Sequence, residues 1–122
     1  MRRKKVLLVD DSLTVLLLHQ VMLAERGYDS VTARDGLEAL ALAETERPDL
    51  VFLDVVMPNL DGFETCRALR GREPTRRTPI ILCSTHSGAR SVQEGFDSGC
   101  DDYLAKPFDG EELTALLRRY LD

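Results

Sequence analysis

Short apolar runs alternate with longer amphipathic segments along the whole chain. The apolar runs have the length of strands, about four to six residues, and the segments between them have the length of helices, about 10 to 15 residues. Several of the boundaries carry a glycine, which is typical of turns and helix ends. The pattern predicts strands at 4–9, 29–33, 50–54, 79–83 and 102–105, and helices at 12–26, 36–46, 62–71, 87–98 and 109–121.

Strand-then-helix units joined by short connections predict an α/β fold with a doubly wound parallel sheet. The runs 4–9, 50–54 and 79–83 are almost wholly apolar, as strands buried on both faces are. The run 29–33, DSVTA, is the most polar and is predicted to lie at an edge of the sheet. With 122 residues and neither an internal repeat nor a linker, residues 1–122 are predicted to form a single domain.

Composition narrows the function classes. A net charge of −5 and a pI near 5.0 argue against direct binding of nucleic acid, which requires a basic face. The three cysteines form no CxxC pair and share no ligand spacing with the two histidines, so we expect reduced thiols rather than a zinc site. The apolar runs are too short for a membrane helix, and the run after the basic start is too short for a secretory signal. A cytoplasmic protein without membrane contact is predicted.

Candidate chemistry gathers where the predicted strands end, because ligands of open α/β sheets bind outside the carboxyl ends of the strands. These ends carry Asp10, Asp11, Asp54, Ser84 and Lys106. Carboxylates held close together repel one another and are normally relieved by a cation, and oxygen ligands suit Mg²⁺, which often accompanies a phosphoryl group. A lysine and a hydroxyl can hold phosphate oxygens. An ionised Asp54 could then attack phosphorus and form an aspartyl phosphate.

A structural alternative stays open for part of this set. Asp11 or Ser12 could simply cap the helix predicted at 12–26. Asp54 could likewise be only a turn residue ahead of the Pro-, Asn- and Gly-containing segment 55–64.

Four motifs together resemble a known family. VLLVDDS at 6–12, LVFLDVVMPNLDGFE at 50–64, IILCST at 80–85 and YLAKPF at 103–108 occur in the order and spacing of the receiver domain of two-component response regulators. The resemblance covers the whole chain. It implies a flavodoxin-like (βα)5 fold with strand order 2-1-3-4-5. It also implies a phosphoryl group received from a sensor histidine kinase or a histidine phosphotransfer protein, with Mg²⁺ as cofactor.

The resemblance assigns roles around the metal. Asp54 would be the phosphoacceptor. Asp11 and Asp54 would bind Mg²⁺ together with the main-chain carbonyl of Val56, and Asp10 would act mostly through a bound water.

It also assigns the switch and the output face. Ser84 matches the hydroxyl switch position, and Lys106 matches the phosphate-binding lysine, whose peptide bond to Pro107 is typically cis. Tyr103 matches the aromatic residue that moves inward when Ser84 is drawn to the phosphate. The predicted helix 87–98, strand 102–105 and helix 109–121 would then form the face that signals to a downstream protein.

The helix predicted at 12–26 offers a docking surface. At about 100° per residue, Val15, Leu18 and Met22 fall within about 60° of one another, which predicts a core stripe. Leu13 and Leu17 fall on the opposite side, so we expect them to be exposed beside the acidic residues and to dock a kinase or phosphotransfer protein.

Other classes fit less well. A Mg²⁺-dependent phosphatase of the haloacid-dehalogenase type would need a second Asp where this chain has Val56, and a flavin or dinucleotide binder would need a Gly-rich turn after the first strand. A receiver that has lost phosphorylation would not need to keep the acids and Lys106. We expect a chain that catalyses only its own phosphorylation and dephosphorylation, as a monomer or a weak phosphorylation-dependent dimer. Either a stand-alone receiver or a receiver domain cut from a longer regulator or hybrid kinase is compatible with the sequence.

Overall fold

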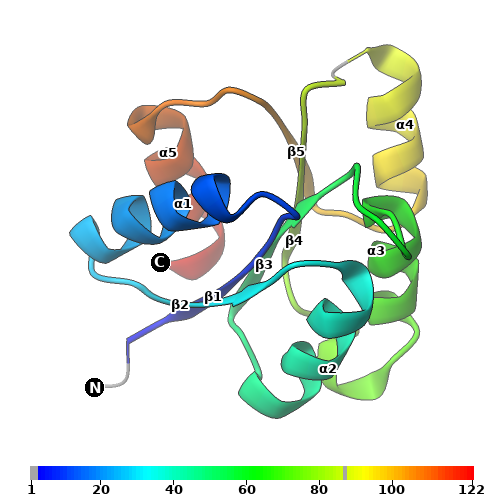
Figure 1. Ribbon diagram of the computed structural model, residues 1–122, viewed down its shortest axis with the longest axis horizontal. Coiled ribbons are helices and arrows are strands. Elements are labelled where there is room, and N and C mark those ends of the chain that lie inside the picture. Colours follow the sequence, from blue (N-terminus) through cyan, green and yellow to red (C-terminus); the bar gives the residue numbers. More distant parts are fainter. Residues whose placement is uncertain (1–2, 87) are drawn as a thin grey trace.

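The computed structural model describes residues 3–86 and 88–122, and these form a five-stranded parallel sheet with helices on both faces (Figure 1). The strand order is β2-β1-β3-β4-β5, which confirms the predicted topology and places DSVTA at an edge. The strands are β1 (Lys5–Val9), β2 (Asp29–Ala33), β3 (Leu50–Asp54), β4 (Ile80–Ser84) and β5 (Asp102–Ala105); the helices are α1 (Leu13–Glu25), α2 (Gly36–Glu46), α3 (Gly62–Arg70), α4 (Ala89–Asp97) and α5 (Gly110–Leu121).

The predicted boundaries agree with the observed ones to within one or two residues. A short 3₁₀ helix, Glu73–Thr75, was not predicted, since three residues carry no periodicity. The prediction for α4 began at Ser87, which lies outside the described residues. No helix in the described part of the chain is long and apolar enough to cross a membrane.

Two hydrophobic layers hold the helices to the sheet. Helices α1 and α5 cover one face, and α2, α3 and α4 lie over the other (Figure 1). Successive strand residues point to opposite faces, so β1 contributes Leu7 to the layer under α2 and α3, and Leu8 to the layer under α1 and α5. This alternation explains why β1, β3 and β4 are apolar at almost every position.

The core face of α1 differs from the prediction. Leu16 and Leu23 are buried against the sheet, whereas Leu18 is 58% exposed. The predicted stripe of Val15, Leu18 and Met22 is therefore wrong at Leu18, and Val15 and Met22 are only half-buried. The physical reason is that α1 carries apolar residues on nearly all sides, so its periodicity alone does not define which side faces the sheet.

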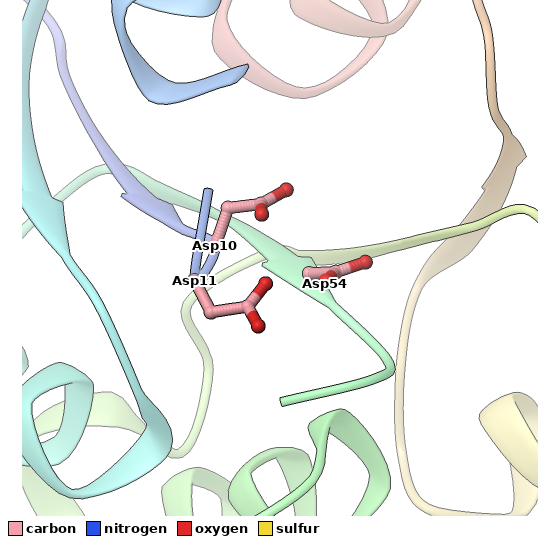
Figure 2. A group of neighbouring side chains, drawn as sticks. All are labelled: Asp10, Asp11 and Asp54. Atoms are coloured by element: carbon pink, nitrogen blue, oxygen red, sulfur yellow. The ribbon is translucent and has the colours of Figure 1, made fainter. Parts of the chain in front are cut away.

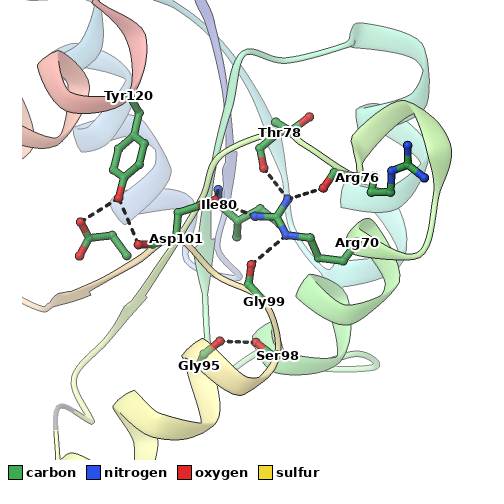
Figure 3. Close-up of polar contacts among 10 residues, drawn as sticks. Arg70, Arg76, Thr78, Ile80, Gly95, Ser98, Gly99, Asp101 and Tyr120 are labelled. Carbon is green, nitrogen blue, oxygen red and sulfur yellow. Dashed lines mark hydrogen bonds and ion pairs between the residues drawn. The ribbon is translucent and has the colours of Figure 1, made fainter.

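At the amino ends of β4 and β5, Arg70 joins three segments (Figure 3). From the end of α3, its guanidinium donates to the carbonyls of Thr78 at 2.6 Å and Gly99 at 2.8 Å, and to Asp101 Oδ2 at 2.6 Å. The same Asp101 oxygen accepts the Ile80 N–H at 2.8 Å. Arg70 thus holds together the amino ends of β4 and β5, whereas the candidate site lies at the carboxyl ends of the strands.

Candidate functional site

Three carboxylates meet at the carboxyl ends of β1 and β3 (Figure 2). Asp10 follows β1 directly, Asp11 comes next, and Asp54 is the last residue of β3. Parallel pairing of Val9 with Leu53 brings these strand ends to the same height in the sheet. One oxygen from each of the three side chains lies within 4.8 Å of the other two.

Lys106 joins two of these acids. It follows β5, and its Nζ donates to Asp10 Oδ2 at 2.7 Å and to Asp54 Oδ1 at 3.0 Å. The three side chains are only 17%, 7% and 11% exposed, respectively, so water screens these contacts weakly. The Lys106–Pro107 peptide bond is cis, as the resemblance implied.

Burial and charge act in opposite directions on these groups. Burial raises the pKa of the Asp54 carboxyl above its usual range, and the hydrogen bond and charge of Lys106 reduce this shift without cancelling it. Burial by itself lowers the pKa of Lys106, but the hydrogen bonds and charges of Asp10 and Asp54 outweigh it, so that the pKa is raised. Lys106 is therefore a cation at neutral pH.

The structure decides which residue caps α1. Ser12 Oγ accepts the Val15 N–H at 3.3 Å and so supplies the N-cap. Ser12 in turn donates its N–H to Asp10 Oδ1 at 2.9 Å. Asp11 is exposed, and no hydrogen bond to its carboxylate occurs within residues 3–86 and 88–122. Capping therefore does not account for Asp11.

The loop after Asp54 turns away from the sheet immediately. Asn59 adopts a left-handed conformation with φ 69°, and the Gly62 N–H donates to the Val55 carbonyl at 2.8 Å. Gly62 packs so closely that a Cβ there would lie 2.5 Å from the Asp54 carbonyl oxygen. The Val56 side chain is 60% exposed, and in the described part of the chain its carbonyl accepts no hydrogen bond.

Ser84 and Tyr103 are connected through the loop that follows β4. Ser84 is 1% exposed, and its Oγ accepts the His86 N–H at 2.9 Å. The Tyr103 hydroxyl donates to the His86 carbonyl at 2.6 Å. Gly95 of α4 lies directly against the Tyr103 ring, since a Cβ there would be 2.8 Å from Tyr103 Cδ2. The loop and α4 therefore both contact the tyrosine.

Leu13 and Leu17 are exposed on α1, at 56% and 53%. Two further residues of this apolar surface, Leu18 and Val21, are 58% and 55% exposed and were not predicted to be part of it. Together these four residues form a surface on one helix, which we call the α1 stripe.

Arg34 also contacts the loop that carries Asp11, and the sequence pattern did not predict this contact. Its guanidinium donates to the Asp11 carbonyl. Its position directly after the predicted strand 29–33 could have indicated it, because the carboxyl end of this strand lies at the same end of the sheet as the carboxyl ends of the other strands.

The donor set fits a divalent cation. The Lys106 ammonium contacts two of the three clustered carboxylates, so the site keeps an excess of negative charge. All candidate ligands are hard oxygens, and the exposed Asp11 keeps the site open to water, as Mg²⁺ prefers. An ionised carboxylate between a lysine and such an ion is an arrangement suited to phosphoryl transfer.

Comparisons with known proteins agree with this geometry. The family model described as "Response regulator receiver domain" matches residues 6–118. The alkaline phosphatase synthesis transcriptional regulatory protein PhoP of Bacillus subtilis is 42% identical over 118 residues, which are 97% of this chain and 48% of that protein. This chain therefore spans about half the length of PhoP. Protein PilG of Pseudomonas aeruginosa is 36% identical over 96% of this chain and 87% of its own.

Solved structures show the same fold. The chemotaxis protein CheY4 of Vibrio cholerae superimposes with a TM-score of 0.93 at 39% identity, covering 98% of this chain and all of that chain. The receiver domain of the sensor histidine kinase PA1611 of Pseudomonas aeruginosa, which has a magnesium ion coordinated in its active-site cleft, superimposes with a TM-score of 0.91 at 34% identity, covering 98% of each chain. With its motifs, strand order and acidic site all in agreement, this chain belongs to the response regulator receiver domain family.

Proposed function

We propose that residues 1–122 act as a single cytoplasmic receiver domain in which Asp54 accepts a phosphoryl group from a phosphohistidine of a sensor kinase or phosphotransfer protein. The observation that carries the proposal is the double contact of Lys106 with Asp10 and Asp54 beside Asp11. This contact holds a buried nucleophile in place and leaves its ionised form next to a positive charge.

The transfer uses groups of this chain for positioning and charge. A carboxylate oxygen of Asp54 attacks phosphorus, the new P–O bond forms as the P–N bond to histidine breaks, and the electron pair of that bond remains with the histidine nitrogen. The Lys106 ammonium, now 3.0 Å from Asp54, can move to a phosphoryl oxygen and neutralise it. Asp11, Asp54 and the Val56 carbonyl would hold Mg²⁺, with Asp10 acting mostly through a bound water, and the bound ion would supply further charge neutralisation.

Signalling would follow from Ser84. The hydroxyl accepts the His86 N–H and can still donate its own hydrogen to a phosphoryl oxygen, so a movement of Ser84 Oγ toward the phosphoryl group would draw the His86 loop with it. His86 also holds the Tyr103 hydroxyl through its carbonyl, so movement of this loop alters Tyr103 and the face formed by α4, β5 and α5. This face would bind a downstream protein target, with a monomer or a weak phosphorylation-dependent dimer as the active form.

The α1 stripe would dock the phosphodonor. Four exposed apolar residues on α1, the helix that begins two residues after Asp11, suit the apolar side of partner helices. Leu13→Ala with Leu17→Ala should slow transfer from a phosphohistidine protein and leave the reaction with acetyl phosphate unchanged. An equal loss in both reactions would remove the docking role.

Intact mass spectrometry after incubation with acetyl phosphate and Mg²⁺ tests the proposed function. One added phosphoryl group is expected, absent in Asp54→Asn and retained in the control Asp97→Asn, which changes an exposed carboxylate on α4. Phosphorylation that persists in Asp54→Asn would overturn the assignment.

A further inference from the structure

The turn between β2 and α2 contacts both loops that carry the acidic site. Arg34 follows the last residue of β2, and its Nε and Nη2 donate to the Asp11 carbonyl at 3.3 and 3.0 Å. The next residue, Asp35, accepts the Asn59 side-chain amide at 3.1 Å. One dipeptide therefore joins the loop after β1 to the loop after β3.

Asp11 depends on this contact more than the other acids do. Asp10 is held by Ser12 and Lys106, and Asp54 by Lys106. The Asp11 carbonyl lies outside α1, because the first helical bond of α1 runs to the Ser12 carbonyl. Within residues 3–86 and 88–122, Arg34 is the only hydrogen-bonding partner of Asp11.

We infer that Arg34 is a positioning residue for the metal site: its two-nitrogen contact fixes the main chain of Asp11 and so directs the Asp11 carboxylate toward Asp10 and Asp54. This inference rests on the proposed function, because the ion concerned is the Mg²⁺ of phosphoryl transfer. Contacts that orient metal ligands commonly change metal affinity by about 10- to 100-fold. Arg34 is exposed and acts through the backbone, so a smaller effect, about three- to ten-fold, is expected.

The charge of Arg34 acts in the opposite direction. A guanidinium beside the site repels a divalent cation, so charge alone predicts that removing it strengthens Mg²⁺ binding. Water and salt screen this repulsion at an exposed position. The two effects differ in sign, and the direction of the change in affinity separates them.

Mg²⁺ titrations followed by amide NMR shifts of residues 10–12 and 54–56 provide the test. Arg34→Ala should weaken binding about three- to ten-fold. Arg34→Lys should weaken it less, because a lysine ammonium can still donate one hydrogen bond to the Asp11 carbonyl in place of the two from Arg34. Arg47→Ala is the matched control, since Arg47 is exposed, donates to the Glu44 carbonyl and ends α2 away from the site; it should bind like the wild type. Equal or tighter binding by Arg34→Ala would overturn the inference.

A kinetic measurement distinguishes positioning from chemistry. With acetyl phosphate, the Mg²⁺ concentration for half-maximal rate should rise in Arg34→Ala, while the rate at saturating Mg²⁺ should equal that of the wild type. A lower rate at saturating Mg²⁺ would contradict a role that acts only through Asp11. If the wild type binds no Mg²⁺, the metal site of the proposed function is overturned and this inference with it. If the wild type binds Mg²⁺ and Arg34→Ala binds it with the same affinity, only this inference is overturned.

Discussion

Substituting Gly62 by Ala should distort the backbone of the phosphoacceptor strand. A Cβ at Gly62 would lie 2.5 Å from the Asp54 carbonyl oxygen, 2.7 Å from Val55 Cα and 3.1 Å from the Asp54 carbonyl carbon. All three atoms belong to the main chain, so no side chain can rotate to make room. Ordinary van der Waals contact begins near 3.4 Å, and either β3 or the first turn of α3 has to shift by almost 1 Å.

The expected loss of stability is about 2 kcal/mol. Overpacking of a closely packed site costs about 1–3 kcal/mol, and the rigid backbone places Gly62→Ala near the upper end of this range. The gain in helix propensity from Gly to Ala offsets up to about 1 kcal/mol. Gly71→Ala at the other end of α3 is the matched control, because a Cβ there would lie 3.6 Å from the carbonyl oxygens of Arg67 and Ala68, an ordinary contact distance, and the φ of −82° suits alanine. It should be neutral or stabilising by a few tenths of a kcal/mol.

Urea unfolding followed by circular dichroism measures both variants. Phosphorylation of folded Gly62→Ala by acetyl phosphate should also be slower, because Asp54 shifts with its carbonyl. Equal unfolding midpoints for Gly62→Ala and Gly71→Ala would refute the argument that the close approach of α3 to β3 constrains this position.

Three further predictions concern stability. Arg70→Ala should lower the free energy of unfolding by about 2 kcal/mol, because three main-chain carbonyls and the Asp101 carboxylate lose a donor. Arg67→Ala, which changes an exposed residue on the same helix, should change it by less than about 0.5 kcal/mol in urea titrations. Leu16→Ala should lower the free energy of unfolding by about 3 kcal/mol and Leu18→Ala by less than about 0.5 kcal/mol, because Leu16 is buried and Leu18 is exposed. A larger loss for Leu18→Ala in thermal melts would support the core face predicted from the sequence. Asp54→Asn should stabilise the Mg²⁺-free fold at neutral pH, because burial raises the pKa of Asp54 and disfavours its charged form. This gain in stability should disappear as the pH falls below the ordinary carboxyl pKa, where Asp54 is neutral in the folded and the unfolded state. A gain that persists in acid would contradict this cause.

Much of the site was predictable because the carboxyl ends of all strands in a parallel sheet lie at the same end of the sheet. Asp10, Asp54 and Lys106 each follow or end an apolar run, and any α/β arrangement of these runs would bring them to the same edge. Arg34, which follows the polar strand β2, was not among the predicted site residues. Its role depends on the reach of a long side chain to the Asp11 carbonyl, and neither spacing nor hydrophobic pattern encodes that reach.

The sequence by itself determined the order of strands and helices, the parallel sheet and the set of residues at its carboxyl edge, since hydrophobic periodicity and turn residues are local properties. Only the tertiary structure decided which side of α1 is buried, because a helix that is apolar on nearly all sides can present several of them, and packing against the sheet and α5 selects Leu16 and Leu23. The tertiary structure likewise decided that Lys106 contacts Asp10 and Asp54 at once, because the three residues come from segments that are far apart in the chain. It also decided that Ser12 rather than Asp11 caps α1, because the cap depends on how sharply the chain turns after β1.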